Sequence, residues 1–193
     1  MTALTRLGLG GPGKNYTRPI AAKAESEAVK GRISLMGAGD LYTGIRSVEI
    51  APTVDTNAYA AEDLIGDVIE IAAGQISRLN KAILQGVNVW DDADQGVALA
   101  LLLFRREPSN TTFTDQAALA IHSSDRDALI GVVPVAAADY VALNAQKVAY
   151  IGNLFIPIDL SGGHSLWVAV VSAGTPTYGA ATDLRFTLNF TGG

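Results

Sequence analysis

Cysteine is absent from the 193-residue chain, which excludes disulfides, thiolate metal sites and a cysteine nucleophile. Only two histidines are present, and neither has a glutamate or cysteine at zinc-ligand spacing. The longest apolar run, residues 96–104, is too short to span a bilayer. The N-terminus also lacks the basic-then-apolar layout of a signal peptide. We therefore expect a soluble protein that is made in a cytoplasm.

Charged side chains are also scarce, at 17% of the residues against a usual share of about a quarter. Hydrophobic residues make up 49%, which is enough for a substantial core in one domain of this length. The combination predicts more apolar surface than one compact monomer would bury. A protein that packs against partners tolerates such a surface better than a free one.

The charge is divided unevenly along the chain. Residues 1–46 carry seven basic and three acidic side chains, a net charge of +4, whereas the remainder carries seven basic and sixteen acidic ones, a net charge of −9. A basic segment on an acidic body can complement another copy's body, another acidic protein or nucleic acid. The basic residues are too loosely clustered to favour nucleic acid.

Residues 1–46 show no helical or strand period, and residues 7–13 combine glycine and proline in a way that excludes a stable helix or a central strand. We predict that this segment is an extended N-terminal arm, with a boundary near Ser47, that docks in a groove on a partner. The residues expected to bind the partner are Leu4, Arg6, Leu7, Leu9, Lys14, Tyr16, Arg18 and Ile20.

Residues 47–193 change character, because short β-rich runs alternate with clusters of Gly, Pro, Asn and Asp. This pattern predicts an all-β protein, an antiparallel and jelly-roll-like β-sandwich of about eight or nine strands. Strands are expected at residues 47–50, 67–72, 82–90, 97–104, 130–135, 147–151, 154–158, 166–171 and 184–190.

Single residues refine this prediction. Gly86 indicates a bulge, and Pro134 indicates an edge strand or a strand end. Gly152-Asn153 predicts a hairpin between the two strands that flank it. A helical segment is expected at residues 123–129, capped by Ser123 or Ser124. The expected core anchors are Trp90, Phe104, Phe155, Trp167 and Phe186.

The stretch from Gly8 to Lys14 matches the spacing of a dinucleotide fingerprint and most of a phosphate loop. Both motifs need a preceding strand and a following helix, but only seven residues precede Gly8 and Asn15-Tyr-Thr-Arg-Pro19 is not helical. Pro12 also removes a backbone donor. A flexible hinge that passes between subunits is the better interpretation, and no cofactor is expected.

Two further groups of residues could in principle form a calcium site or a catalytic triad. Asp91, Asp92 and Asp94 form an acidic turn that can supply calcium ligands, but it fails the EF-hand pattern, so an ordinary Asx turn is favoured. Asp159, His164 and Ser165 contain the groups of a catalytic triad, yet no serine lies in a nucleophile elbow. We therefore expect neither a metal site nor a catalytic site.

Several segments resemble those of known virion proteins. Residues 1–16 resemble the N-terminus of small structural proteins encoded by tailed bacteriophages. The segments 55–66, 104–115, 130–133 and 174–184 together resemble a phage virion β-sandwich family, and their motifs are turn and strand signatures. The resemblance implies a non-enzymatic head-decoration or accessory protein that binds capsid or tail subunits, with a trimer as a familiar arrangement. It does not distinguish head, neck and tail.

The expected function is therefore that of a structural subunit of a phage particle, located on the capsid surface. As a decoration or cement protein it would bind the major capsid protein and copies of itself, without contact to membrane or nucleic acid. One alternative is a tail or baseplate protein that binds host carbohydrate, with Trp90 beside Asp91 and Asp92 as the sugar platform. A second alternative is a hydrolase that uses an Asp or His in a loop, such as His164.

Overall fold

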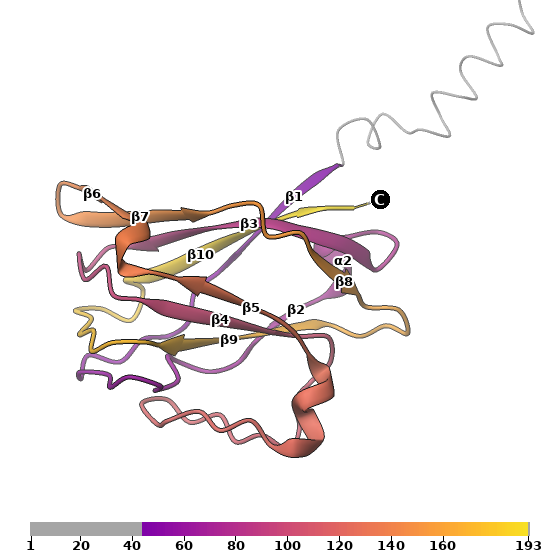
Figure 1. Ribbon diagram of the computed structural model, residues 1–193, viewed down its shortest axis with the longest axis horizontal. Coiled ribbons are helices and arrows are strands. Elements are labelled where there is room, and N and C mark those ends of the chain that lie inside the picture. The colour runs from indigo at the N-terminus through magenta and orange to yellow at the C-terminus, as the bar shows by residue number, and fades with distance from the viewer. Residues whose placement is uncertain (1–43, 193) are drawn as a thin grey trace, which may run out of the picture. The chain divides into compact units, whose positions relative to one another are not determined.

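The computed structural model describes residues 44–192, which form an all-β body of two antiparallel sheets (Figure 1). The predicted partner-binding residues between Leu4 and Ile20, and the glycine-rich stretch 8–14, lie outside the described residues. Ten strands occur within residues 44–192: β1 (Ile45–Ile50), β2 (Ile69–Ile71), β3 (Lys81–Asp91), β4 (Leu99–Phe104), β5 (Leu129–Val135), β6 (Tyr140–Leu143), β7 (Gln146–Ile151), β8 (Ile156–Asp159), β9 (Leu166–Ser172) and β10 (Leu184–Thr191). The prediction of an antiparallel β-sandwich is confirmed.

The two sheets are stacked face to face, as Figure 1 shows. The larger sheet has the strand order β1-β10-β3-β7-β6, and β8 also pairs with β3; the smaller sheet has the order β2-β9-β4-β5. Three short helical turns connect strands: α2 (Ala73–Ile76), η1 (Ser123–Ala128) and η2 (Ala137–Asp139). The strand β1 begins at Ile45, two residues before the predicted boundary of the arm, because Ile45 pairs with Thr191 and Arg46 with Phe190.

The core lies between the two sheets and follows the period-two pattern of the strands. Along β10 the alternating residues Leu184, Phe186, Leu188 and Phe190 are each 0% exposed, as the sequence predicts. The facing sheet contributes Leu101 and the other inward residues of β4 and β9. Pro134 lies on β5, which is an edge strand, so that prediction is confirmed.

Replacing a central core side chain is expected to cost much of the stability of the body. We expect Phe186→Ala to lower the free energy of unfolding by about 3–5 kcal/mol, because it removes a fully buried ring and leaves a cavity. Phe155→Ala is the matched control, since this ring is 63% exposed and its loss should change the free energy by less than about 0.5 kcal/mol. Urea denaturation of both variants measures the difference, and equal losses would contradict the assignment of the core.

The strand β3 carries the bulge that Gly86 predicts. The pairing with β10 shifts between Asn189 and Phe190, where Asn189 faces Gly86 but Phe190 faces Leu84, so Gln85 is the extra residue. The predicted hairpin at Gly152-Asn153 is wrong. Both β7 and β8 pair with β3, one after the other along its length, because the chain between them continues along the same edge of β3 without reversing.

Other local predictions also need correction. The strand β6 was not predicted, and it pairs with β7 through a two-residue turn in which Asn144 has φ +56°. The segment at 123–129 is a short 3₁₀ helix whose cap is His122, because the His122 Nδ1 accepts a hydrogen bond from the Ser124 backbone N–H. Trp90 and Phe155 are surface residues, so two of the five predicted aromatic anchors are wrong, whereas Trp167 is partly buried and packs against a second apolar cluster.

Candidate interaction surfaces and ligand cleft

An apolar surface covers one end of the outer side of the larger sheet. We call it the outer face and define it as Trp90 on β3, Val141 and Leu143 on β6, and Val148 and Tyr150 on β7. Registers place these side chains on one side, because Trp90 pairs with Val148 and Val148 with Val141. Val141 and Tyr150 are each more than 60% exposed. Contiguous apolar surface of this kind marks an interaction site.

Tyr150 is held on this face by two glycines. An ideal Cβ on Gly86 would lie 2.9 Å from the Tyr150 Cε2, and one on Gly152 would lie 2.8 Å from the Tyr150 Cε1. The ring therefore lies across both positions and occupies the space that two side chains would fill. It remains 62% exposed. A ring fixed in this way loses little conformational entropy when a partner covers it.

Phe155 adds a third exposed aromatic ring, from the break between β7 and β8. Its backbone has φ +49°, which is an unfavourable conformation for a bulky side chain. Such strain costs on the order of 1–3 kcal/mol and is typical of functional positions. Ile83 lies nearby on β3, opposite Pro157, and is also exposed. The apolar character thus extends to the other end of β3.

The five edge strands within residues 44–192 differ in how they discourage pairing with another chain. The edge strand β1 carries Arg46 and Glu49, β2 carries Glu70, β5 carries Pro134 and β8 carries Pro157, all of which oppose strand addition. The edge strand β6 has the sequence Tyr-Val-Ala-Leu, without charge or proline. Two of its residues belong to the outer face. The β6 edge is therefore the least protected edge among residues 44–192.

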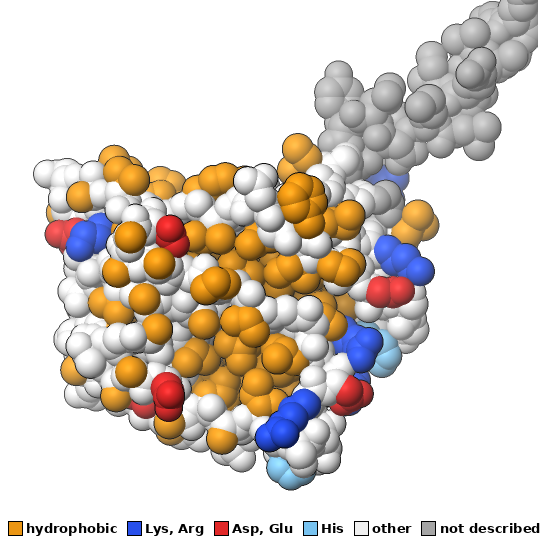
Figure 2. All heavy atoms as spheres, in the orientation of Figure 1, with side chains coloured by type: hydrophobic (Ala, Val, Ile, Leu, Met, Phe, Trp, Pro, Cys, Tyr) orange, Lys and Arg blue, Asp and Glu red, His pale blue; other side chains and the backbone are white. Residues whose placement is uncertain are grey.

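A long segment, residues 105–122, covers part of the other side of the sandwich. Phe113, Leu119 and Ile121 from this segment pack on the outward side of the smaller sheet, where they meet Phe104 and Trp167 in a second apolar cluster. The rest of that side is open at β5, where Val132 is 47% exposed. Figure 2, which is drawn in the orientation of Figure 1, shows hydrophobic side chains gathered in the middle of the face turned towards the viewer.

Asp125 fixes the segment to η1. Its carboxylate is 0% exposed and accepts hydrogen bonds from the Asn110 backbone N–H at 2.9 Å, from the Asn110 amide at 3.1 Å and from the Thr111 hydroxyl at 2.8 Å. The Thr111 hydroxyl oxygen in turn accepts from the His122 backbone N–H. Burial alone would raise the pKa of Asp125, but the hydrogen bonds from Asn110 and Thr111 outweigh burial and hold the pKa below its ordinary value.

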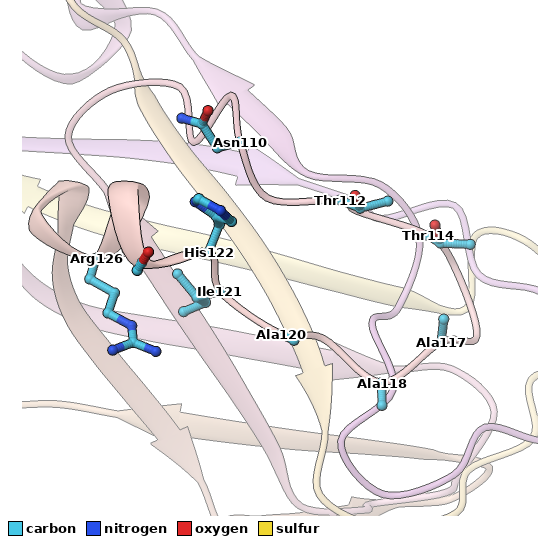
Figure 3. A pocket seen from close by; sticks show the side chains of 10 residues that line it. Asn110, Thr112, Thr114, Ala117, Ala118, Ala120, Ile121, His122 and Arg126 are labelled. Atoms are coloured by element: carbon cyan, nitrogen blue, oxygen red, sulfur yellow. The ribbon is translucent and has the colours of Figure 1, made fainter.

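An open cleft of about 600 Å³ lies between the segment 105–122 and η1. In Figure 3 residues 110–114 lie on one side, residues 117–122 on the other, and Arg126 extends from η1 at one end. The lining combines neutral polar, methyl and basic groups: Asn110, Thr112, Thr114, Ala117, Ala118, Ala120, Ile121, His122, Ser123 and Arg126. Among residues 44–192, no carboxylate lines it. No periodic pattern marks this cleft in the sequence, because the cleft depends on the non-local contacts of Asp125.

The acidic turn after Trp90 is an Asx turn, as favoured. Asp91 is 1% exposed, and its carboxylate accepts from the backbone N–H groups of Ala93 at 3.1 Å and Gly96 at 2.6 Å. Asp92 pairs with Arg185 at 2.6 Å. The carbohydrate-binding alternative placed Trp90 and Asp91 on one surface, whereas Trp90 points outward and Asp91 points inward and accepts from two backbone N–H groups.

Asp159, His164 and Ser165, which contain the groups of a catalytic triad, do not bond to one another in the structure. The Ser165 hydroxyl donates to the Glu70 carboxylate, and the Asp159 carboxylate accepts from Ser161 and pairs with Lys81 at 3.3 Å. His164 lies exposed in the loop between β8 and β9. Within residues 44–192, no group of three His, Asp or Glu side chains is arranged to hold a metal ion.

Asp159 yields a prediction on pH. Hydrogen bonds from the Ser161 side chain and backbone, with a further contribution from Lys81, lower its pKa from 3.8 to about 2. A lowered pKa means that these contacts stabilise the fold above pH 3.8 and that their contribution is lost as the pH falls towards 2. We expect a carbon-detected NMR titration to place the Asp159 midpoint near 2, and Ser161→Ala to move it back towards 3.8. An unchanged midpoint in that variant would contradict the assigned cause.

The fold defines the described part as an all-β protein of the antiparallel two-sheet sandwich class. Comparison with known proteins finds no family model and no curated protein sequence that matches the chain. Across the described residues, no helix has both the length and the apolar character needed to cross a membrane.

Proposed function

We propose that the protein is a non-enzymatic structural subunit of a tailed-bacteriophage particle that acts by binding other protein subunits. The observation that carries this proposal is the outer face, with Tyr150 fixed across Gly86 and Gly152. Protein interfaces have buried aromatic anchors at their centres, and a rigid, exposed ring surrounded by aliphatic side chains is suited to that role. The phage assignment rests on the resemblance of residues 1–16 and of the body segments.

The particular role that we propose is capsid decoration. In this role the protein binds the major capsid protein and copies of itself, as a trimer, and adds buried area between neighbouring subunits. The outer face and the β6 edge supply the contacts of the body, because they carry apolar side chains and unpaired backbone groups without a net charge. An uncharged contact suits a chain of net charge −5 that meets its own copies.

Particle stability tests the decoration role. Particles that lack the protein are expected to assemble but to break at a lower temperature, because neighbouring capsid subunits lose the area buried by the protein. Release of packaged DNA during a temperature ramp measures the difference, and particles supplied with the purified protein are the control. If neither assembly nor heat stability changes, the cement role is wrong. If labelling places the protein on the tail, the decoration role is wrong.

A further inference from the structure

The cleft beside η1 presents polar groups that have no partner among the described residues. No hydrogen bond within residues 44–192 engages the hydroxyls of Thr112 and Thr114 or the guanidinium of Arg126. The His122 Nδ1 accepts from the Ser124 backbone N–H at 3.2 Å, so a neutral ring carries its proton on Nε2. The cleft therefore offers two hydroxyls, an imidazole N–H and a guanidinium to a ligand.

The charge near the cleft favours a ligand with a carboxylate. Arg126 is the charged residue of the lining, and the neighbouring acids are already engaged: Asp125 is buried among donors, and Asp127 pairs with Arg106 at 2.6 Å. A guanidinium binds a carboxylate through two parallel hydrogen bonds. One cation among several neutral donors and acceptors suits a ligand with one acid group and several hydroxyls.

The shape and rigidity of the cleft support the same class of ligand. Ala117, Ala118 and Ala120 lie together on one side of the cleft, opposite Thr112 and Thr114, and their methyl groups can contact the C–H face of a sugar ring. Long segments without regular structure are uncommon in compact domains and are usually functional. This segment is held in place by the buried carboxylate of Asp125. We infer that the cleft binds a carboxylated saccharide, a uronic-acid unit of a glycan, whose carboxylate pairs with Arg126.

This binding activity is independent of the proposed decoration role, since the cleft and the outer face lie on different sheets. A test uses the full chain labelled with ¹⁵N and titrated with trigalacturonate. We expect the amide signals of residues 110–126 to shift on titration. The methyl ester of the same trisaccharide keeps the hydroxyls but lacks the charge, and it should bind at least about tenfold more weakly.

Two variants locate the carboxylate contact. Arg126→Gln should bind trigalacturonate as weakly as the wild type binds the ester, a loss of about tenfold, and should bind the ester unchanged. Arg78→Gln removes another exposed cation and should bind both ligands like the wild type. Equal binding of trigalacturonate by the two variants would overturn the inference.

Simple ligands separate this inference from its alternatives. Acetate should cause no comparable shifts at the concentration that saturates with trigalacturonate, because it lacks the hydroxyls. Binding of acetate at equal affinity would reduce the cleft to a plain anion site and overturn the saccharide assignment. Equal or tighter binding of triglutamate would assign the cleft to acidic peptides instead. Shifts confined to residues outside 110–126 would also overturn the inference.

Discussion

Deletion of residues 1–43 is expected to weaken attachment to particles greatly while the body stays folded. The deletion stops before β1, because Ile45 pairs with Thr191 and the Arg46 guanidinium donates to the Gly74 carbonyl at 3.1 Å. The predicted arm carries apolar residues that each contribute roughly 1.5–3 kcal/mol when fully covered. Ordering the backbone opposes this at about 1–2 kcal/mol per residue. Docking is therefore favourable only where a groove also supplies backbone hydrogen bonds.

The deletion should weaken attachment at least about 100-fold, or about 2.7 kcal/mol. The thermal midpoint of the purified body should stay within about 2 °C of the full chain, which is the change expected when nothing in the core is lost. Co-sedimentation with particles and calorimetry measure the two quantities. If the truncated chain unfolds or aggregates, residues 1–43 belong to the core. If it binds as tightly as the full chain, the body alone carries attachment.

Loss of the Tyr150 ring from the outer face is expected to have the next largest effect. Tyr150→Ala should weaken binding to the partner subunit by about 2 kcal/mol or more, roughly 30-fold, as for an aromatic residue at the centre of an interface. The stability of the monomer should change little, because this ring is 62% exposed. Leu79→Ala is the control, since Leu79 is 71% exposed and lies outside the outer face.

Gly152→Ala separates the position of the ring from its presence. The three atoms nearest to the added methyl group all belong to Tyr150, the closest being Cε1 at 2.8 Å, so we expect the ring to move while the backbone stays in place. We expect this variant to bind almost as weakly as Tyr150→Ala and to fold normally. Gly86→Ala is different, because its methyl group would also lie 2.9 Å from the Ile151 carbonyl oxygen and should lower stability. Normal binding by Gly152→Ala would contradict the role of the fixed ring.

The strands could be predicted because their signals are local. The alternation from Leu184 to Phe190 identifies both the strand and its buried side, and Gly86 and Pro134 mark a bulge and an edge. The pairing of β7 and β8 could not be predicted, because the decision between a hairpin and a shared neighbour depends on β3, more than 50 residues away. Local turn chemistry at Gly152-Asn153 therefore pointed to the wrong connection.

The candidate sites were harder to predict for the same reason. Trp90 is a residue type that is typical of a core anchor, but its register beside Val148 places its side chain on the outer side of the sheet. Tyr150 becomes a fixed ring only because Gly86, on another strand, lies beneath it. Asp125 lies in the segment that the sequence predicts to be helical, but the pattern does not reveal that its carboxylate is buried among donors from Asn110 and Thr111. Each feature depends on contacts between distant segments.

A density map of intact particles tests the structural role most directly. The two-sheet body should be present in the shell in many copies, with the outer face around Tyr150 and Val141 covered by another subunit. Residues of the N-terminal arm should lie against a neighbour rather than against their own body. A map in which the sandwich is missing from the particle, or in which the outer face is exposed to solvent in every copy, would contradict the proposal.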